Sequence, residues 1–164
     1  MLVKTLMTGS PLATCRPGDP LQAAARLMWE RDCGAVPVVD NARHVVGVIT
    51  DRDICMAAYT QGKPLSAIPV SSAMARQVIS CHGEDDVRLA EDLMRDYQVR
   101  RLPVLNTDGQ LVGMLSLNDL ARSARDGNGS YRLESNGHVS PAELAATLAG
   151  VGERRASGSP GQPR

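Results

Sequence analysis

Aromatic side chains are scarce in this chain of 164 residues, which has one Trp, three Tyr and no Phe. Proteins that bind single-stranded nucleic acid stack the bases on aromatic rings, so this chain offers few platforms for that purpose. A net charge is also lacking, because 18 Lys and Arg balance 18 Asp and Glu. A neutral chain has no general electrostatic attraction for nucleic acid or for an anionic membrane. We therefore expect neither as a partner.

Long apolar runs and paired cysteines are missing as well. No stretch approaches the roughly 20 apolar residues that span a bilayer, and the N-terminal residues show no long apolar region with a small-residue cleavage site. The four cysteines form no Cys-x-x-Cys pair, and no group of His or acidic residues has the spacing of metal ligands. These absences predict a cytoplasmic protein with reduced thiols, no metal and no required cofactor.

The chain contains an internal duplication. Residues 13–54 align with residues 79–120 at a constant shift of 66 without a gap, and 10 of the 42 aligned positions are identical. The identities fall mostly on apolar, Gly and Pro positions, as a shared backbone requires. Each copy predicts the order β-α-β-β-α. The expected extended segment, helix, two strands and second helix cover residues 13–15, 19–28, 36–40, 44–50 and 52–60 in the first copy, and 78–80, 84–97, 102–106, 111–116 and 118–125 in the second.

One copy of about 55 residues is near the lower limit for an independent hydrophobic core. Since 43% of the residues are apolar, the chain is globular, and we expect the two copies to bury each other's exposed faces about a pseudo-two-fold axis. The predicted fold class is α/β (α+β) with two tandem repeats. We divide the chain into a first repeat, a connector, a second repeat, a linker, a short C-terminal helix and a disordered tail, at residues 1–60, 61–75, 76–126, 127–139, 140–152 and 153–164.

A motif of Gly, two apolar residues, Thr or Ser, two variable residues and Asp occurs once per copy. It starts at Gly47 and again at Gly113, each time where a strand should end and a helix begin. A hydroxyl and a carboxylate one turn apart, beside free backbone N–H groups, can hold a sugar phosphate: the carboxylate accepts from ribose hydroxyls while the other groups face phosphate. The same pattern is also a helix cap, which stabilises a helix by about 1 kcal/mol without any ligand.

The double β-α-β-β-α pattern, the paired motifs and the apolar-Pro-Val runs at 36–38 and 102–104 together resemble a CBS-domain pair, also called a Bateman module. The resemblance covers residues 1–126 and identifies a stand-alone pair. It implies a non-enzymatic regulatory module that binds adenosyl ligands (AMP, ADP, ATP, NAD or S-adenosylmethionine) in clefts between the repeats. It also implies a homodimer that signals by a conformational shift to a protein partner, which the sequence does not name.

The resemblance assigns roles to individual residues. Asp53 and Asp119 would contact ribose, with Thr50 and Ser116 near ribose or phosphate. The residues placed near adenine are Thr14, Ser80, Val36 and Leu102. Among the cations, the candidates for phosphate are Arg52, Arg100 and Arg101, because a guanidinium offers a bidentate fork to phosphate oxygens, with Lys4 and His82 after them.

Two other functions compete with ligand sensing. In the first, the protein is a ligand-independent dimerisation or scaffold protein whose motifs act only as helix caps. In the second, Cys15 and Cys81, which occupy equivalent positions, form a thiol redox pair. No nucleophile, base and acid set is evident, so we do not expect an enzyme. A capping pattern at Ser140–Glu143 opens the C-terminal helix, which is either a docking element or dimer contact, or a cap over the module.

Overall fold

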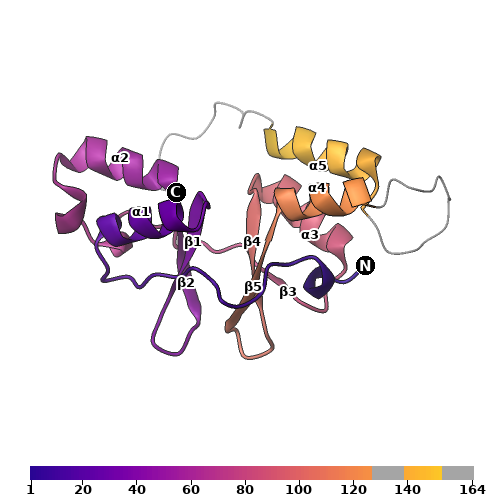
Figure 1. Cartoon of the computed structure of the whole chain (residues 1–164), viewed down its shortest axis with the longest axis horizontal. Helices are drawn as coiled ribbons and strands as arrows, with labels where there is room; N and C mark the ends of the chain where they lie inside the picture. Colours follow the sequence, from indigo (N-terminus) through magenta and orange to yellow (C-terminus); the bar gives the residue numbers. More distant parts are fainter. Residues whose placement is uncertain (127–138, 153–164) are drawn as a thin grey trace. The chain divides into compact units, whose positions relative to one another are not determined.

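The computed structural model describes residues 1–126 and 139–152. It confirms the expected mixed α+β fold and divides into two compact units, each containing one repeat (Figure 1). The repeat-1 unit consists of Pro11–Val78 and Asp108–Leu111, and the repeat-2 unit of Met1–Ser10, Ile79–Thr107 and the described residues from Val112 onwards. Residues 127–138 of the expected linker and the expected tail lie outside the described residues. The domain boundaries drawn from the sequence stay predictions.

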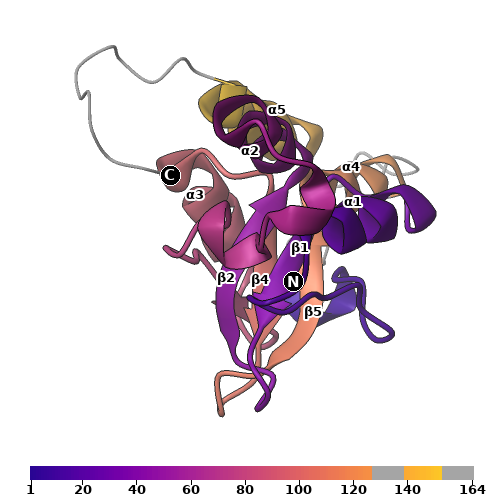
Figure 2. The same cartoon turned by 90° about the vertical axis from the view of Figure 1, so that its left-hand side faces the viewer.

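The repeat-1 unit is built around an antiparallel hairpin of β1 (Ala35–Val39) and β2 (Val45–Thr50). Cys15 adds a parallel bridge to Val38, where the sequence predicts a short first strand. The helices α1 (Leu21–Glu30) and α2 (Asp51–Gln61) contact each other and the hairpin. Figures 1 and 2 show the turn between β1 and β2 at one end of the hairpin and the start of α2 at the other.

The repeat-2 unit contains a three-stranded sheet in the order β3-β4-β5. Its strands and helices, in chain order, are β3 (Cys81–His82), α3 (Val87–Tyr97), β4 (Arg101–Leu105), β5 (Leu111–Ser116) and α4 (Leu117–Asp126). β3 runs parallel to β4, as the duplicated order requires. Among the described residues, no helix combines the length and the apolar character needed to cross a bilayer.

Two of the helices begin later than the sequence predicts. Pro20 is not the first helical residue but the extended residue before α1, and α3 begins at Val87 rather than at residue 84. The reason is the acidic residues upstream. Asp86 caps α3 by accepting a hydrogen bond from the N–H of Arg88 at 2.9 Å, and Asp19 accepts one from the N–H of Arg16 at 2.8 Å. These carboxylates hold the preceding turns in non-helical conformations.

Each repeat is completed by a segment that precedes it in the chain or follows its second helix. The connector carries two short 3-10 helices, η2 (Leu65–Ala67) and η3 (Val70–Ser72), and pairs with β2 through a bridge between Ala75 and Val48. The N-terminal segment carries η1 (Val3–Thr5) and pairs with β5 through a bridge between Thr8 and Met114. The N-terminal residues therefore belong to the core of the second repeat and the connector to that of the first.

The two motif glycines make these pairings possible. A Cβ atom at Gly47 would lie 2.7 Å from Met74 Sδ and 2.9 Å from the carbonyl oxygen of Ala75. A Cβ atom at Gly113 would collide with Met7 in the same way. Both glycines are buried, and neither has an unusual φ. The glycine of each motif thus serves packing against a distant segment rather than turn geometry.

A fifth helix, α5 (Pro141–Gly152), covers part of the repeat-2 unit. It packs on α3 and α4 (Figure 1). Its capping box is present, since the Ser140 N–H donates to Glu143 Oε2 at 3.0 Å and the Glu143 N–H donates to Ser140 Oγ at 3.1 Å. Thr147 is fully buried, and Val139 and Val151 join the core. The structure therefore shows that α5 caps the repeat-2 unit, and a role in docking or dimerisation stays a prediction.

Candidate functional site

The first copy of the motif forms a capping box where β2 ends and α2 begins. The Thr50 hydroxyl donates to Asp53 Oδ2 at 2.6 Å and accepts from the Asp53 N–H at 3.2 Å. The Thr50 N–H donates to the same carboxylate oxygen at 3.0 Å. Both bonds to the carboxylate use Oδ2, and Oδ1 of Asp53 has no hydrogen-bond partner in the described part of the chain. One carboxylate oxygen at a half-buried position is thus available to a ligand.

The second copy repeats this geometry and adds a cation. The Ser116 N–H and hydroxyl donate to Asp119 Oδ2 at 2.8 and 2.5 Å. Arg122 Nη2 donates to the other oxygen, Oδ1, at 2.9 Å. The residue equivalent to Arg122 in the first copy is Met56, which has no such donor. Both oxygens of Asp119 are therefore engaged within the chain, and its side chain is only 9% exposed.

Most of the backbone N–H groups at the start of α2 are also engaged. The Asp51 N–H donates to the Gly34 carbonyl at 3.3 Å, the Arg52 N–H to Asp51 Oδ1 at 2.7 Å, and the Asp53 N–H to Thr50. In the second copy, the Leu117 N–H donates to the Arg100 carbonyl. The sequence alone suggests that these groups face a phosphate, but in this conformation a phosphate would depend mainly on side chains.

The remaining site residues expected from the sequence divide evenly between the two units. Thr14, Val36 and Arg52 lie in the repeat-1 unit with Thr50 and Asp53. Arg52 is exposed and Thr14 half-buried, whereas Val36 is completely buried. Because Val36 pairs with Ile49, next to Thr50, it can shape a site only through the position of its strand.

The repeat-2 unit holds the corresponding second set, which consists of Ser80, Leu102 and Arg101 beside Ser116 and Asp119. Ser80 and Arg101 are half-buried, and Leu102 is completely buried in the core. Each unit thus contains one complete set of the expected residue types. The roles given to these residues by the resemblance stay predictions.

The thiols of Cys15 and Cys81, which occupy equivalent positions in the two copies, are poorly reactive. Burial, reinforced by the nearby Asp19, raises the pKa of Cys15 to about 12. Burial and Asp85 raise the pKa of Cys81 to about 12 in the same way. Both are free thiols and stay protonated near neutral pH. Since the thiolate is the nucleophile, a redox role for this pair has little chemical support.

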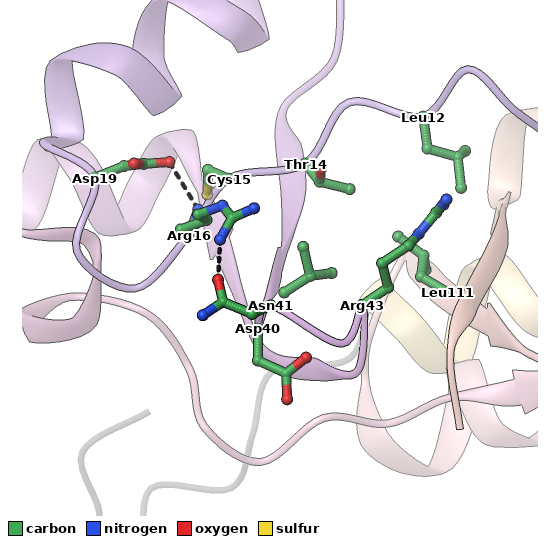
Figure 3. A pocket seen from close by; sticks show the side chains of 10 residues that line it. Leu12, Thr14, Cys15, Arg16, Asp19, Asp40, Asn41, Arg43 and Leu111 are labelled. Carbon is green, nitrogen blue, oxygen red and sulfur yellow. Dashed lines mark hydrogen bonds between the residues drawn. The ribbon is translucent and has the colours of Figure 1, made fainter. Parts of the chain in front are cut away.

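The repeat-1 unit also contains a pocket that the sequence did not indicate. It has a volume of about 290 Å³ and lies where the chain before α1 meets the turn after β1 (Figure 3). The alignment of the two copies contains the one hint of this pocket that we find in the sequence. Arg43, which lies in this turn, aligns with Gly109 of the second copy. In residues 1–126 and 139–152, the pocket included, no group of three His, Cys, Asp or Glu residues is placed to hold a metal ion.

Comparison with known proteins decides the family. The model of the CBS domain matches this chain twice, at residues 3–59 and 70–126. The chain belongs to the CBS-domain family. Its two matches coincide with the two copies found in the sequence. The CBS domain-containing protein YhcV of Bacillus subtilis (strain 168) is 38% identical over 119 residues, which are 73% of this chain and 82% of YhcV.

Solved CBS-domain pairs have the same fold. The pair of protein MJ0100, in complex with 5′-methylthioadenosine and S-adenosyl-L-methionine, is 26% identical with a TM-score of 0.67, and the match covers 74% of this chain and 94% of that one. CBSX2 in complex with AMP is 25% identical with a TM-score of 0.68, over 76% of this CBS protein and 96% of CBSX2. Both relatives were thus solved with adenosyl compounds bound.

Proposed function

We propose that this CBS protein is a non-enzymatic regulatory module that binds an adenine nucleotide at its two motifs. AMP, ADP and ATP are the first candidates, with NAD and S-adenosylmethionine next. The observation that carries the proposal is the open Oδ1 atom of Asp53 in a carboxylate that its own helix cap holds in place. The adenosyl ligands of the structural relatives support the same ligand class.

The chemistry of the motif suits a nucleoside. A carboxylate accepts hydrogen bonds from both hydroxyls of a ribose, and a cap that fixes its rotamer reduces the entropy lost on binding. Arg52 is exposed in the first turn of α2 and carries a guanidinium that can pair with phosphate oxygens. Thr14 and Val36 come from the same unit and complete the expected set.

The two copies should differ in affinity. At Asp119, a ribose hydroxyl must share or displace the hydrogen bond from Arg122. At Asp53 there is no such competitor among the described residues. We therefore expect a nucleotide to occupy the first copy at lower concentration than the second. A ligand that prefers one arrangement of the pair would shift the population towards it, which is the signal passed to a protein partner.

Calorimetry with AMP, ATP and S-adenosylmethionine tests this proposal. We expect Asp53→Asn to weaken the tighter binding event about 10-fold or more, because a hydrogen bond to a charged group contributes about 1.5–3 kcal/mol. Asp119→Asn should affect only the weaker event. Asp51→Asn, in the same turn and exposed, is the matched control. If none of these ligands gives heat or thermal stabilisation at millimolar concentration, the motifs act only as caps, as in the scaffold hypothesis.

We also propose that the protein is a homodimer and that its contact is the exposed face of α1 and α2. Trp29 on α1 is 87% exposed, and on α2 Tyr59 is 82% exposed and Met56, one turn before it, 48%. The residue equivalent to Trp29 in the second copy is Arg95, which packs against Gly150 of α5. A helix thus covers this face in one repeat, while in the other the same face is apolar and open. Large exposed apolar side chains in a group are typical of protein contacts.

Light scattering on a size-exclusion column tests the dimer. We expect the unaltered protein to have twice the mass of one chain and Trp29→Glu to shift it to the mass of one chain. Leu148→Glu is the control, because Leu148 is an exposed apolar residue on α5, outside the proposed face. A Trp29→Glu protein that remains dimeric would place the contact elsewhere.

A further inference from the structure

The pocket in the repeat-1 unit lies at the far end of the hairpin from the Thr50–Asp53 motif. β1 and β2 pair from Ala35 opposite Thr50 to Val39 opposite Val45, and Val39 lines the pocket. Ala35 and Val39 are four residue steps apart along β1, which corresponds to about 13 Å. The turn that carries Arg43 therefore lies away from the Thr50–Asp53 motif, although the pocket shares Thr14 with the residues expected at the nucleotide site.

One residue at the pocket has an uncommon backbone conformation. Arg43 has φ of 69°, in the left-handed region that favours glycine. The second copy makes the same turn with Gly109, at φ of 76°. The turn itself therefore does not require Arg, and an Arg in this conformation carries a backbone cost that glycine avoids. A large charged side chain at such a position is a candidate for a function.

The charged side chains around the pocket differ in whether they have a hydrogen-bond partner. Asp19 accepts from the Arg16 N–H, and Asp40 accepts from the N–H groups of Ala42 and His44, each at 2.9 Å. These backbone hydrogen bonds, the one from His44 first, lower the pKa of Asp40. Arg16 donates from its guanidinium to Asn41.

Arg43 is the exception among these groups. Its guanidinium has no hydrogen-bond or ion-pair partner among the described residues, whereas both acids at the pocket are bonded. The charged group without a partner at this pocket is therefore a cation, and the ligand that would pair with it is an anion. Figure 3 shows the Arg16 and Arg43 side chains on two sides of the pocket, with Thr14 between them.

We propose that this pocket binds a small molecule through a phosphate or carboxylate group. Arg43 supplies two parallel N–H donors to the oxyanion, and Thr14 supplies a hydroxyl. The apolar side chains of Leu12 and Leu111 line the pocket for the body of the molecule. A volume of about 290 Å³ limits the ligand to a compact molecule. The pocket shares Thr14 with the residues expected at the nucleotide site, but Arg43 is not one of those residues, so substitution of Arg43 tests the pocket separately.

The experiment uses the full chain labelled with ¹⁵N and titrated with sodium phosphate or sodium malonate at constant ionic strength, with sodium chloride as the reference. We expect saturable amide shifts at residues 12–16 and 39–43 with one or both probes and none with chloride. The probe that binds more tightly identifies phosphate or carboxylate as the group. If neither probe gives saturable shifts in these segments, the proposal is wrong.

The decisive variant is Arg43→Gly, because it installs the residue that the second copy already uses in this turn. We expect it to keep the fold, as judged by its spectrum outside the pocket, and to bind the preferred probe at least 10-fold more weakly. Arg43→Lys keeps the charge but loses the fork, so its binding should be intermediate. Arg31→Gln, an exposed Arg at the end of α1, is the control. Unchanged binding in Arg43→Gly, or an equal loss in Arg31→Gln, would overturn the proposal.

Discussion

Replacing Gly47 with Val is expected to lower the free energy of unfolding by about 3 kcal/mol, the upper part of the range for overpacked cores. The first added carbon atom would already lie 2.9 Å from the carbonyl oxygen of Ala75. That carbonyl accepts a hydrogen bond from the Val48 N–H at 3.0 Å, and the Ala75 N–H donates to the Val48 carbonyl at 2.9 Å. A side chain at Gly47 must therefore push away a backbone segment that two hydrogen bonds hold in place.

Urea unfolding followed by circular dichroism measures this effect. Gly18→Val is the matched control, because nothing lies within 4 Å of a Cβ atom at Gly18 and its φ is ordinary. We expect the control to change the free energy of unfolding by less than about 0.5 kcal/mol, as for other surface substitutions. Equal losses for the two variants would show that the close approach of Ala75 is not what requires glycine at position 47.

Ending the chain after residue 138 is expected to lower the free energy of unfolding of the repeat-2 unit by about 2–4 kcal/mol. The truncation removes α5, and with it the buried Val139 and Val151. Burial of a Val side chain contributes about 1.5–3 kcal/mol, and part of this sum is offset by the entropy that the helix no longer loses.

The truncation would also change the surroundings of Glu91. Burial is the main cause that raises the pKa of this carboxyl, with the nearby Glu143 adding to it. A raised folded pKa for an acid reduces stability as the pH rises through it. Hydration of Glu91 in the shorter chain should therefore remove a penalty that is present at pH 7 and absent at low pH. The loss of Glu143 acts in the opposite direction, because hydrogen bonds with Ser140 lower the pKa of this carboxyl and so stabilise the folded chain at neutral pH. Comparison of the loss at pH 4 and pH 7 measures which of the two effects is larger.

Urea titrations of the repeat-2 unit, monitored by amide signals of β4 and β5, measure this loss at both pH values. A chain that ends after Gly152 is the control, because it keeps every described contact of α5. We expect it to unfold as the full chain does. A truncation at residue 138 with no loss of stability would mean that α5 contributes nothing to the repeat-2 core.

Local features of the fold could be predicted from the sequence. Apolar periodicity located the helices, and the spacing of Thr50 from Asp53 predicted a capping box that the structure contains. These features depend on residues three or four positions apart. The duplication added the second copy of each, including the Ser116–Asp119 cap.

Long-range contacts could not be predicted in this way. The approach of Ala75 to Gly47 joins residues that no local pattern connects, and the same holds for Met7 and Gly113. Arg122 follows Asp119 by one helical turn, so the hydrogen bond between them is local. We did not find it in the sequence, because both copies have the same aspartate and were treated as equivalent there. Differences between the copies, such as Arg43 against Gly109, carried more information on possible sites than the positions they share.

The pairing of the N-terminal segment with the second repeat has a consequence for synthesis on the ribosome. The Val3 N–H donates to the Asp85 carbonyl at 2.9 Å, and the Val87 N–H donates to the Met1 carbonyl at 2.8 Å. Residues 1–3 are therefore translated long before residues 85–87, with which they pair, and must wait until the second repeat is being made. Closing such a wide loop is entropically costly and slow. In the nascent chain, residues 1–8 therefore stay without their hydrogen-bond partners while the first repeat is already able to collapse.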